Sequence, residues 1–180
     1  AIGFRAQVWN IGAEGQLILG AIAASALAIA FDGPTSLLLL PAMILAGMLA
    51  GMAWAGIAAL LRTQFNANEI LVTFMLTSVA LQLLYYLVTG PMKDPMGFNF
   101  PQSISFGQSA TFPLLIPGTR ANASLFLGLA ATLAAFVFVR YSFAGYRLSV
   151  GGLAPAAATY AGFSSKRAIW LALLVSGGAA

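Results

Sequence analysis

Two residue types that often carry chemistry, cysteine and histidine, are missing from this sequence of 180 residues. Without cysteine the chain can form neither a disulfide nor a thiolate metal site. Without histidine it lacks the commonest metal ligand and the commonest general base, so sites for haem, zinc or non-haem iron are not expected. We therefore expect no catalytic residue, no metal and no cofactor.

Charge is also scarce, because only 7% of the residues are charged and 61% are hydrophobic. A soluble domain carries about 25% charged residues. So little charge cannot cover a water-facing surface, and the composition predicts an integral membrane protein surrounded by the lipid bilayer. The apolar runs do not alternate as barrel strands would, which predicts an all-α, polytopic helical bundle. The basic residues are scattered between apolar segments, so no nucleic-acid partner is expected.

Several apolar segments are long enough to cross a bilayer, which takes roughly 20 helical residues. We expect about five transmembrane helices within one transmembrane domain, residues 1–180, the last helix being cut off. The chain begins at Ala1 without methionine and ends inside an apolar run, so we expect an interior fragment of a longer protein. The predicted spans are residues 16–31, 36–61, 70–88, 121–139 and 168–180.

A polar stretch, residues 9–16, stands directly before the first span and contains Asn10, Glu14, Gln16 and two glycines. An ionisable group at the membrane centre costs about 2.5–3.5 kcal/mol. Glycine permits a helix break or a close backbone approach, and irregular backbone is tolerated in a membrane where it lines a cavity. We predict that Asn10, Glu14 and Gln16 belong to a substrate pathway. The alternative is that Glu14 is a structural carboxylate serving the N–H groups of a broken helix.

A polar stripe marks the third span, where Glu69, Thr73 and Thr77 recur every four residues and share one helix face. Asn68 is expected to cap this helix. The stripe has two interpretations that the sequence leaves open. It could be a wall of the pathway, or it could make interhelical hydrogen bonds, with the threonines bonding their own backbone.

The second span contains the small-residue step Gly47-x-x-x-Gly51, which predicts a closely packed helix interface. The connection at 90–120 holds five of the eight prolines, and we expect an ordered cap on one membrane face.

Basic residues are distributed unequally if successive spans alternate in direction. The positive-inside rule then predicts that segment 140–167 is a cytoplasmic loop, where an energy-coupling partner could act, and that 90–120 is an external loop. A short helix at 155–162 is expected within the cytoplasmic loop. One side holds Arg5, Arg62, Arg140, Arg147, Lys166 and Arg167, and the other holds Lys93 and Arg120.

Four motifs in the same chain order resemble one family. Residues 10–16, N-I-G-A-E-G-Q, resemble the F-N-I-G-A-E-G-Q motif of ABC-importer permeases for nucleosides, in the ribose/branched-chain amino acid permease superfamily, with Trp9 in place of the phenylalanine. Segments 68–76, 90–95 and 152–162 resemble later motifs of that family. The departures are Thr77, Ala154, Ala156 and Thr159, which replace polar or charged residues of those motifs.

The resemblance implies a permease subunit in the bacterial plasma (inner) membrane, multi-pass and without its own ATP site. It implies a dimeric pore formed with a second, identical or different, permease subunit, cytoplasmic ATP-binding subunits, and an external solute-binding lipoprotein. Nucleosides are the favoured substrate, with sugars or branched-chain amino acids as alternatives. The residues implied to couple to the ATPase are Gly152, Pro155, Ala157, Tyr160 and Gly162.

Two other classes of protein were weighed against this one. An intramembrane enzyme would have to use Glu14 and Glu69 without a nucleophile or a metal set. A structural membrane scaffold would leave Glu14 without a role. A transport subunit, with ATP hydrolysis in a separate partner, accounts best for the sequence.

Overall fold

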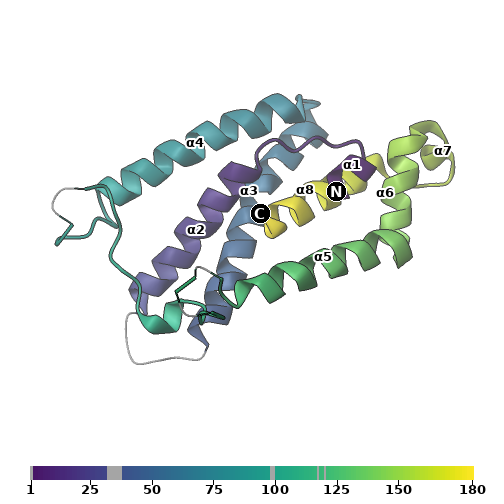
Figure 1. The fold of residues 1–180 in the computed structure, drawn as a ribbon. Helices are drawn as coiled ribbons and strands as arrows, with labels where there is room; N and C mark the ends of the chain where they lie inside the picture. Colours follow the sequence, from purple (N-terminus) through teal and green to yellow (C-terminus); the bar gives the residue numbers. More distant parts are fainter. Residues whose placement is uncertain (1, 32–37, 98–99, 117, 120) are drawn as a thin grey trace.

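The computed structural model describes residues 2–31, 38–97, 100–116, 118–119 and 121–180, which form the helical architecture shown in Figure 1. The all-helical class predicted from composition is confirmed. Four helices are long and apolar enough to cross a membrane: α2 (Ala13–Ala30), α3 (Leu39–Phe65), α4 (Glu69–Thr89) and α5 (Ser124–Tyr141). The other helices are α1 (Ile2–Arg5), the 3₁₀ turn η1 (Gln108–Ala110), α6 (Phe143–Leu153), α7 (Pro155–Tyr160) and α8 (Ser165–Ala179).

Glycines hold α2, α3 and α8 at close distance. A Cβ atom added to Gly47 would lie 3.4 Å from the carbonyl oxygen of Gly20 on α2. One added to Gly51 would lie 2.2 Å from the carbonyl oxygen of Gly177 on α8. The two glycines of the step therefore serve two different partner helices, and the predicted close helix interface is confirmed.

The core between these helices is rich in small side chains, although Leu173 of α8 is also fully buried. Ala55, Ala58 and Ala59 on α3 are fully buried, whereas larger apolar residues such as Leu49 and Phe74 are 64% and 60% exposed. This arrangement reverses that of a soluble protein. It fits a bundle in lipid, where burial of apolar side chains does not drive helix association and small residues let helices approach.

The corner between α3 and α4 is tight and its caps follow from the sequence. Asn66 ends α3 in the left-handed conformation, with φ of 51°. The side-chain oxygen of Asn68 accepts a hydrogen bond from the Ile70 N–H at 3.0 Å, so the predicted N-cap is confirmed.

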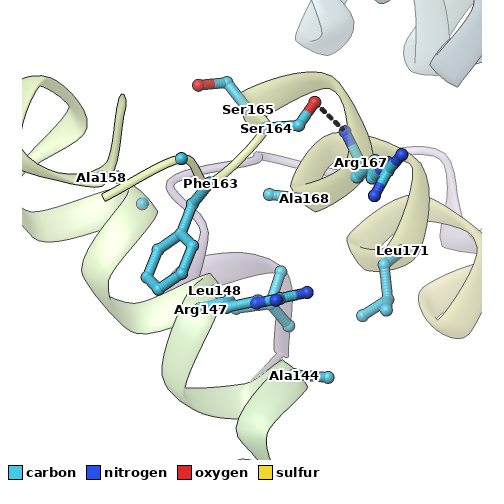
Figure 2. A pocket seen from close by; sticks show the side chains of 12 residues that line it. Ala144, Arg147, Leu148, Ala158, Phe163, Ser164, Ser165, Arg167, Ala168 and Leu171 are labelled. Atoms are coloured by element: carbon cyan, nitrogen blue, oxygen red, sulfur yellow. Dashed lines mark hydrogen bonds between the residues drawn. The ribbon is translucent and has the colours of Figure 1, made fainter. Parts of the chain in front are cut away.

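Segment 140–167 contains more helix than the sequence predicted. The 11-residue helix α6 precedes α7, capped by Ser142, whose hydroxyl accepts from the Gly145 N–H. The sequence did not predict α6 because this helix contains several glycines, and glycine is a poor helix former. Gly145 is needed for packing, since a Cβ there would lie 2.5 Å from the Phe138 carbonyl oxygen. Figure 2 shows α6, α7 and α8 meeting around Leu148 and Ala158, which are both 2% exposed.

The ends of the helices sort into two groups (Figure 1). The α3–α4 corner, the end of α5, helices α6 and α7, and the start of α8 lie toward one end of the bundle. The end of α2, the start of α3 and the end of α4 lie toward the other. The helix directions assumed for the charge count are therefore those of the structure. Helix α5 has no buried residue in this part of the protein.

Candidate functional site

The polar stretch predicted as a pathway element lies at a break in helical structure. Helix α1 ends at Arg5 and α2 starts at Ala13, and Gln7 between them has φ of 53°. Side chains bond two of the backbone N–H groups near the break: Gly12 N–H donates to Asn10 Oδ1 at 3.0 Å, and Ile11 N–H donates to Thr73 Oγ1 at 3.3 Å. The irregular backbone is thus supported by groups from its own stretch and from α4.

Asn10 is the centre of a hydrogen-bonded cluster that joins the break to α2 and α8. Its Nδ2 donates to Gln16 Oε1 and to Ser176 Oγ, both at 2.9 Å, and Gln16 Nε2 donates back to Asn10 Oδ1 at 3.3 Å. Gln16 is only 2% exposed. The structure thus brings together two of the predicted residues. It adds Ser176, which the sequence signalled only as a hydroxyl inside an apolar run.

Glycines bring the start of α2 against α4. A Cβ added to Gly12 would lie 2.7 Å from the Thr73 carbonyl oxygen, and one added to Gly15 would lie 2.9 Å from Thr77 Cα. Any other residue at these positions would push the two helices apart. The close approach expected of the two glycines is therefore present, and it places the cluster beside the polar face of α4.

Glu14 lies in the first turn of α2, where the helix dipole favours a carboxylate. Its side chain is exposed and makes no hydrogen bond or ion pair with any residue that the structure describes. The Glu14 carboxylate therefore has no interaction partner among the residues that the structure describes. Its predicted role in a pathway remains a prediction.

The two threonines of the α4 stripe bond their own helix. Thr73 Oγ1 donates to the Ile70 carbonyl at 3.2 Å, and Thr77 Oγ1 donates to the Thr73 carbonyl at 3.1 Å. Thr73 is 1% exposed and also accepts the hydrogen bond from Ile11. These contacts are those of the packing alternative, and the pathway role of the threonines stays a prediction.

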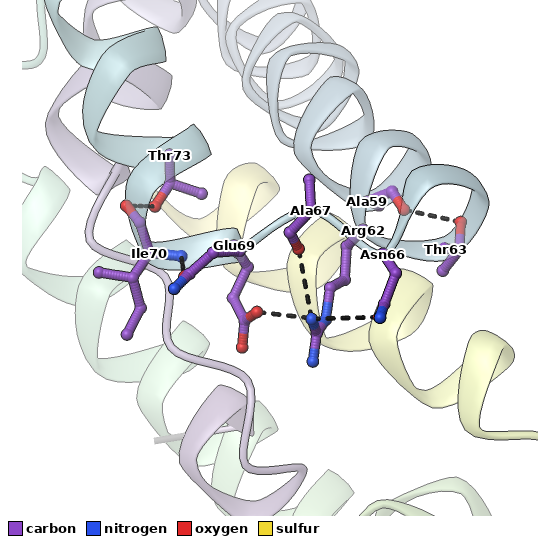
Figure 3. A network of polar contacts seen from close by, with 9 residues as sticks. Ala59, Arg62, Thr63, Asn66, Ala67, Glu69, Ile70 and Thr73 are labelled. Carbon is purple, nitrogen blue, oxygen red and sulfur yellow. Dashed lines mark hydrogen bonds and ion pairs between the residues drawn. The ribbon is translucent and has the colours of Figure 1, made fainter.

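Glu69 differs from the rest of the stripe in forming an ion pair (Figure 3), and its predicted role in a pathway stays a prediction. Arg62 Nε on α3 lies 3.2 Å from Glu69 Oε2, and Glu69 is 8% exposed. Arg62 Nη1 also donates to the Ala67 carbonyl at 3.3 Å. The structure thus brings Glu69 to Arg62 and not to Asn10 or Gln16. Opposite charges on either side of a predicted helix end were the signal that the sequence offered for this pair.

The residues assigned to coupling with the ATPase surround α7. Gly152 lies at the end of α6, where a Cβ would be 2.2 Å from the Arg5 carbonyl oxygen. Pro155 is the first residue of α7. Gly162 lies two residues after the end of α7 and has φ of 76°, a conformation that favours glycine. Tyr160 is 95% exposed and Ala157 is also exposed. Helix α7 therefore buries Ala158 and presents Tyr160 outward.

Comparison with known proteins assigns the family. Residues 1–180 match the family model described as branched-chain amino acid transport system / permease component, and the chain belongs to that family. The match and the four apolar helices make it part of a multi-pass protein of the plasma membrane, which in a bacterial cell is the inner membrane.

Three curated relatives are named for different solutes. The chain is 40% identical over 97% of its length to the glucose ABC transporter permease protein TsgB13 of Haloferax volcanii, and 31% identical over 98% to the guanosine ABC transporter permease protein NupP of Bacillus subtilis. It is 27% identical over 98% to the nucleoside ABC transporter permease protein NupB of Lactococcus lactis. The chain spans about half the length of these relatives, 48–51%. No solved structure matches it.

Proposed function

We propose that this chain is part of the permease subunit of an ATP-driven ABC importer that moves a neutral, polar solute containing a sugar ring. A nucleoside and a simple sugar share that ring, and both classes occur in the names of the relatives. The favoured substrate remains a nucleoside, as the first motif implies, with a sugar as the alternative. A branched-chain amino acid is the remaining alternative, favoured only by the description of the family.

The observation that carries this proposal is the amide and hydroxyl cluster at the helix break. In transporters, discontinuous helices place polar groups at membrane depth where substrates bind. Figure 1 shows the start of α2 and the end of α8 between the two ends of the bundle. The groups gathered there, Asn10, Gln16 and Ser176, are uncharged donors and acceptors suited to hydroxyl groups. These three side chains hydrogen-bond one another in this structure, so a bound solute would replace one of these hydrogen bonds with its own.

Glu14, in the first turn of α2 and two residues before Gln16, is the carboxylate of the proposed pathway. A pathway for a strongly anionic solute would not include an exposed carboxylate. Glu14 therefore favours a neutral solute, whose hydroxyls or ring N–H groups could donate to it. Thr73 and Thr77 flank the cluster from α4 as part of the proposed pathway wall.

The partners and the orientation are part of the same proposal. We place the end of the bundle that holds segment 140–167 in the cytoplasm, by the excess of basic residues there. The exposed side of α7 would then contact an ATP-binding subunit, which hydrolyses ATP in place of this chain. The loop at 90–120 would face an external solute-binding lipoprotein. A second permease subunit would cover exposed apolar faces such as that of α5.

Reconstitution of the full-length permease with its ATP-binding subunits tests the proposal. Proteoliposomes are supplied with labelled guanosine, glucose or leucine and with the cognate solute-binding protein. ATP-dependent uptake of guanosine or glucose, absent with a non-hydrolysable ATP analogue, is the expected result. Uptake of leucine alone would overturn the assignment to solutes with a sugar ring. Uptake without ATP would overturn the importer class.

A further inference from the structure

A cavity of about 210 Å³ lies where α6 and α8 meet behind α7, separate from the cluster at the helix break (Figure 2). Its lining has two chemically different parts. Arg147, Arg167 and Ser165 provide cationic and hydroxyl groups, while Leu148, Ala158 and Leu171 provide an apolar wall. The function proposed above makes no use of this cavity.

Arg147 is held in place by aromatic rings instead of a carboxylate. Its guanidinium carbon lies 4.2 Å from the centre of the Phe143 ring and 5.2 Å from that of Phe163. Phe163 also meets Tyr146 edge-on, with ring centres 6.4 Å apart. A guanidinium stacked in this way keeps its N–H donors free at the ring edges, and planar forked donors suit phosphate oxygens. The cation is thus positioned without being neutralised.

The positive charge of segment 140–167 is not balanced by acidic residues of the segment itself. Segment 140–167 contains no aspartate or glutamate. Within the part of the chain that the structure describes, neither Arg147 nor Arg167 takes part in an ion pair, since Glu69 is bonded to Arg62. Two arginines of different helices therefore line one cavity with their charge uncompensated (Figure 2).

We propose that this cavity binds an anionic phospholipid, with the phosphate at Arg147 and Arg167 and the start of an acyl chain along Leu171, which is partly exposed. Basic pockets between helices at the cytoplasmic surface are suited to phospholipid head groups. The apolar wall distinguishes a lipid from free phosphate, which would gain nothing from contact with Leu171. The proposal depends on the membrane location of these helices but not on the transported solute.

An acidic residue of the ATP-binding subunit is the competing partner for the two arginines. The geometry favours the lipid because α7 turns Ala158 toward the cavity and Tyr160 outward. A protein docked on the exposed side of α7 would contact Tyr160 first. The cavity behind α7 is lined by residues of helices that end at the proposed membrane surface.

The test measures binding of phosphatidylglycerol, labelled on an acyl chain, to the purified full-length permease in detergent, with phosphatidylcholine as the neutral reference. Each basic residue near an anionic head group contributes a factor of about five in affinity. The variant with Arg147→Gln and Arg167→Gln should therefore lose about 25-fold in phosphatidylglycerol affinity and bind phosphatidylcholine unchanged. Arg140→Gln removes a basic residue at the same end but outside the cavity, and should keep the preference.

Several outcomes would overturn the proposal. They are equal binding of the two lipids by the unmodified permease, unchanged preference in the double variant, and full displacement of the labelled lipid by millimolar inorganic phosphate. Loss of the ATP-binding subunit from the double variant, with lipid preference intact, would assign the arginines to that subunit instead. If the double variant fails to fold, Arg167→Gln alone and the charge-preserving Arg167→Lys decide, the first expected to lose about fivefold and the second to keep the preference.

Discussion

The Glu69 carboxylate lies 3.2 Å from Arg62 Nε across the corner between α3 and α4. The two residues lie on either side of the short connection that begins at Asn66, and Arg62 also bonds the Ala67 carbonyl of that connection. The pair therefore links the end of α3 to the start of α4. Its spacing in the sequence assigned Glu69 to the polar stripe of α4. In the structure its carboxylate pairs with Arg62 at the end of the bundle.

The first prediction concerns this pair. Glu69→Gln should destabilise the full-length permease by about 1–3 kcal/mol, because Arg62 is left beside the buried helix start without its partner. Arg62→Gln should have an effect of similar size. Thermal unfolding in detergent measures both, and the exchanged pair Arg62→Glu with Glu69→Arg should recover part of the loss. Normal stability of Glu69→Gln combined with altered solute preference would assign Glu69 to the pathway.

The second prediction concerns the bond between Asn10 and Ser176, which joins residues 166 positions apart. Ser176→Ala should cost about 0.6 kcal/mol, the average for interhelical hydrogen bonds in membranes, because Asn10 keeps Gln16 as a partner. Asn10→Ala should cost more, about 1–3 kcal/mol, since it leaves buried Gln16 without a side-chain partner. A double-mutant cycle on thermal stability should show coupling between the two positions. Strictly additive effects would mean that the bond contributes nothing.

The third prediction concerns Glu14, whose carboxylate has no partner in the described part of the chain. Glu14→Gln keeps the shape and an acceptor oxygen but removes the charge. We expect transport to fall or solute preference to change while thermal stability stays within about 0.5 kcal/mol. Uptake and unfolding are measured on the same preparation. Full transport with unchanged preference, accompanied by a loss of stability, would identify a structural carboxylate.

The fourth prediction concerns α7 and coupling. Tyr160 is 95% exposed, so Tyr160→Asp should leave folding within about 0.5 kcal/mol of the unmodified protein. If α7 contacts the ATP-binding subunit, a new charge on that surface should abolish most of the solute-stimulated ATP hydrolysis. Tyr160→Phe, which keeps the ring, is the matched control and should retain it. Undiminished stimulation in Tyr160→Asp would make α7 a connector only.

The fifth prediction concerns orientation. The chain has no cysteine, so single cysteines can be introduced at the exposed residues Ser105 and Ser165 without a background signal. In intact cells an impermeant thiol reagent should label Ser105→Cys and spare Ser165→Cys, which should react only after the membrane is opened. Labelling of both from outside would reverse or refute the positive-inside assignment.

The amino-acid sequence by itself determined the class of fold, the approximate spans and the cap at Asn68. These follow from local chemistry: apolar length, the amide at a helix start, and glycines at helical spacing. The sequence also identified residues 9–16 as a candidate site, because polar groups next to an apolar span are costly in a membrane unless they have a partner or a function. The small-residue step on α3 identified a helix interface, though not the two helices that share it.

Tertiary structure alone decided which polar groups meet. Both Glu69 and Asn10 stand out as polar residues in the sequence, but the sequence does not show their partners. The turn at the α3–α4 corner brings Glu69 to Arg62, and the packing of α8 brings Ser176 to Asn10. The position of helix α6 also depends on packing. Gly145 is needed there because the end of α5, at the Phe138 carbonyl, leaves no room for a Cβ atom. Spacing along a helix fixes the face that a residue occupies. The partner on that face depends on how helices distant in sequence are placed, which local propensity does not encode.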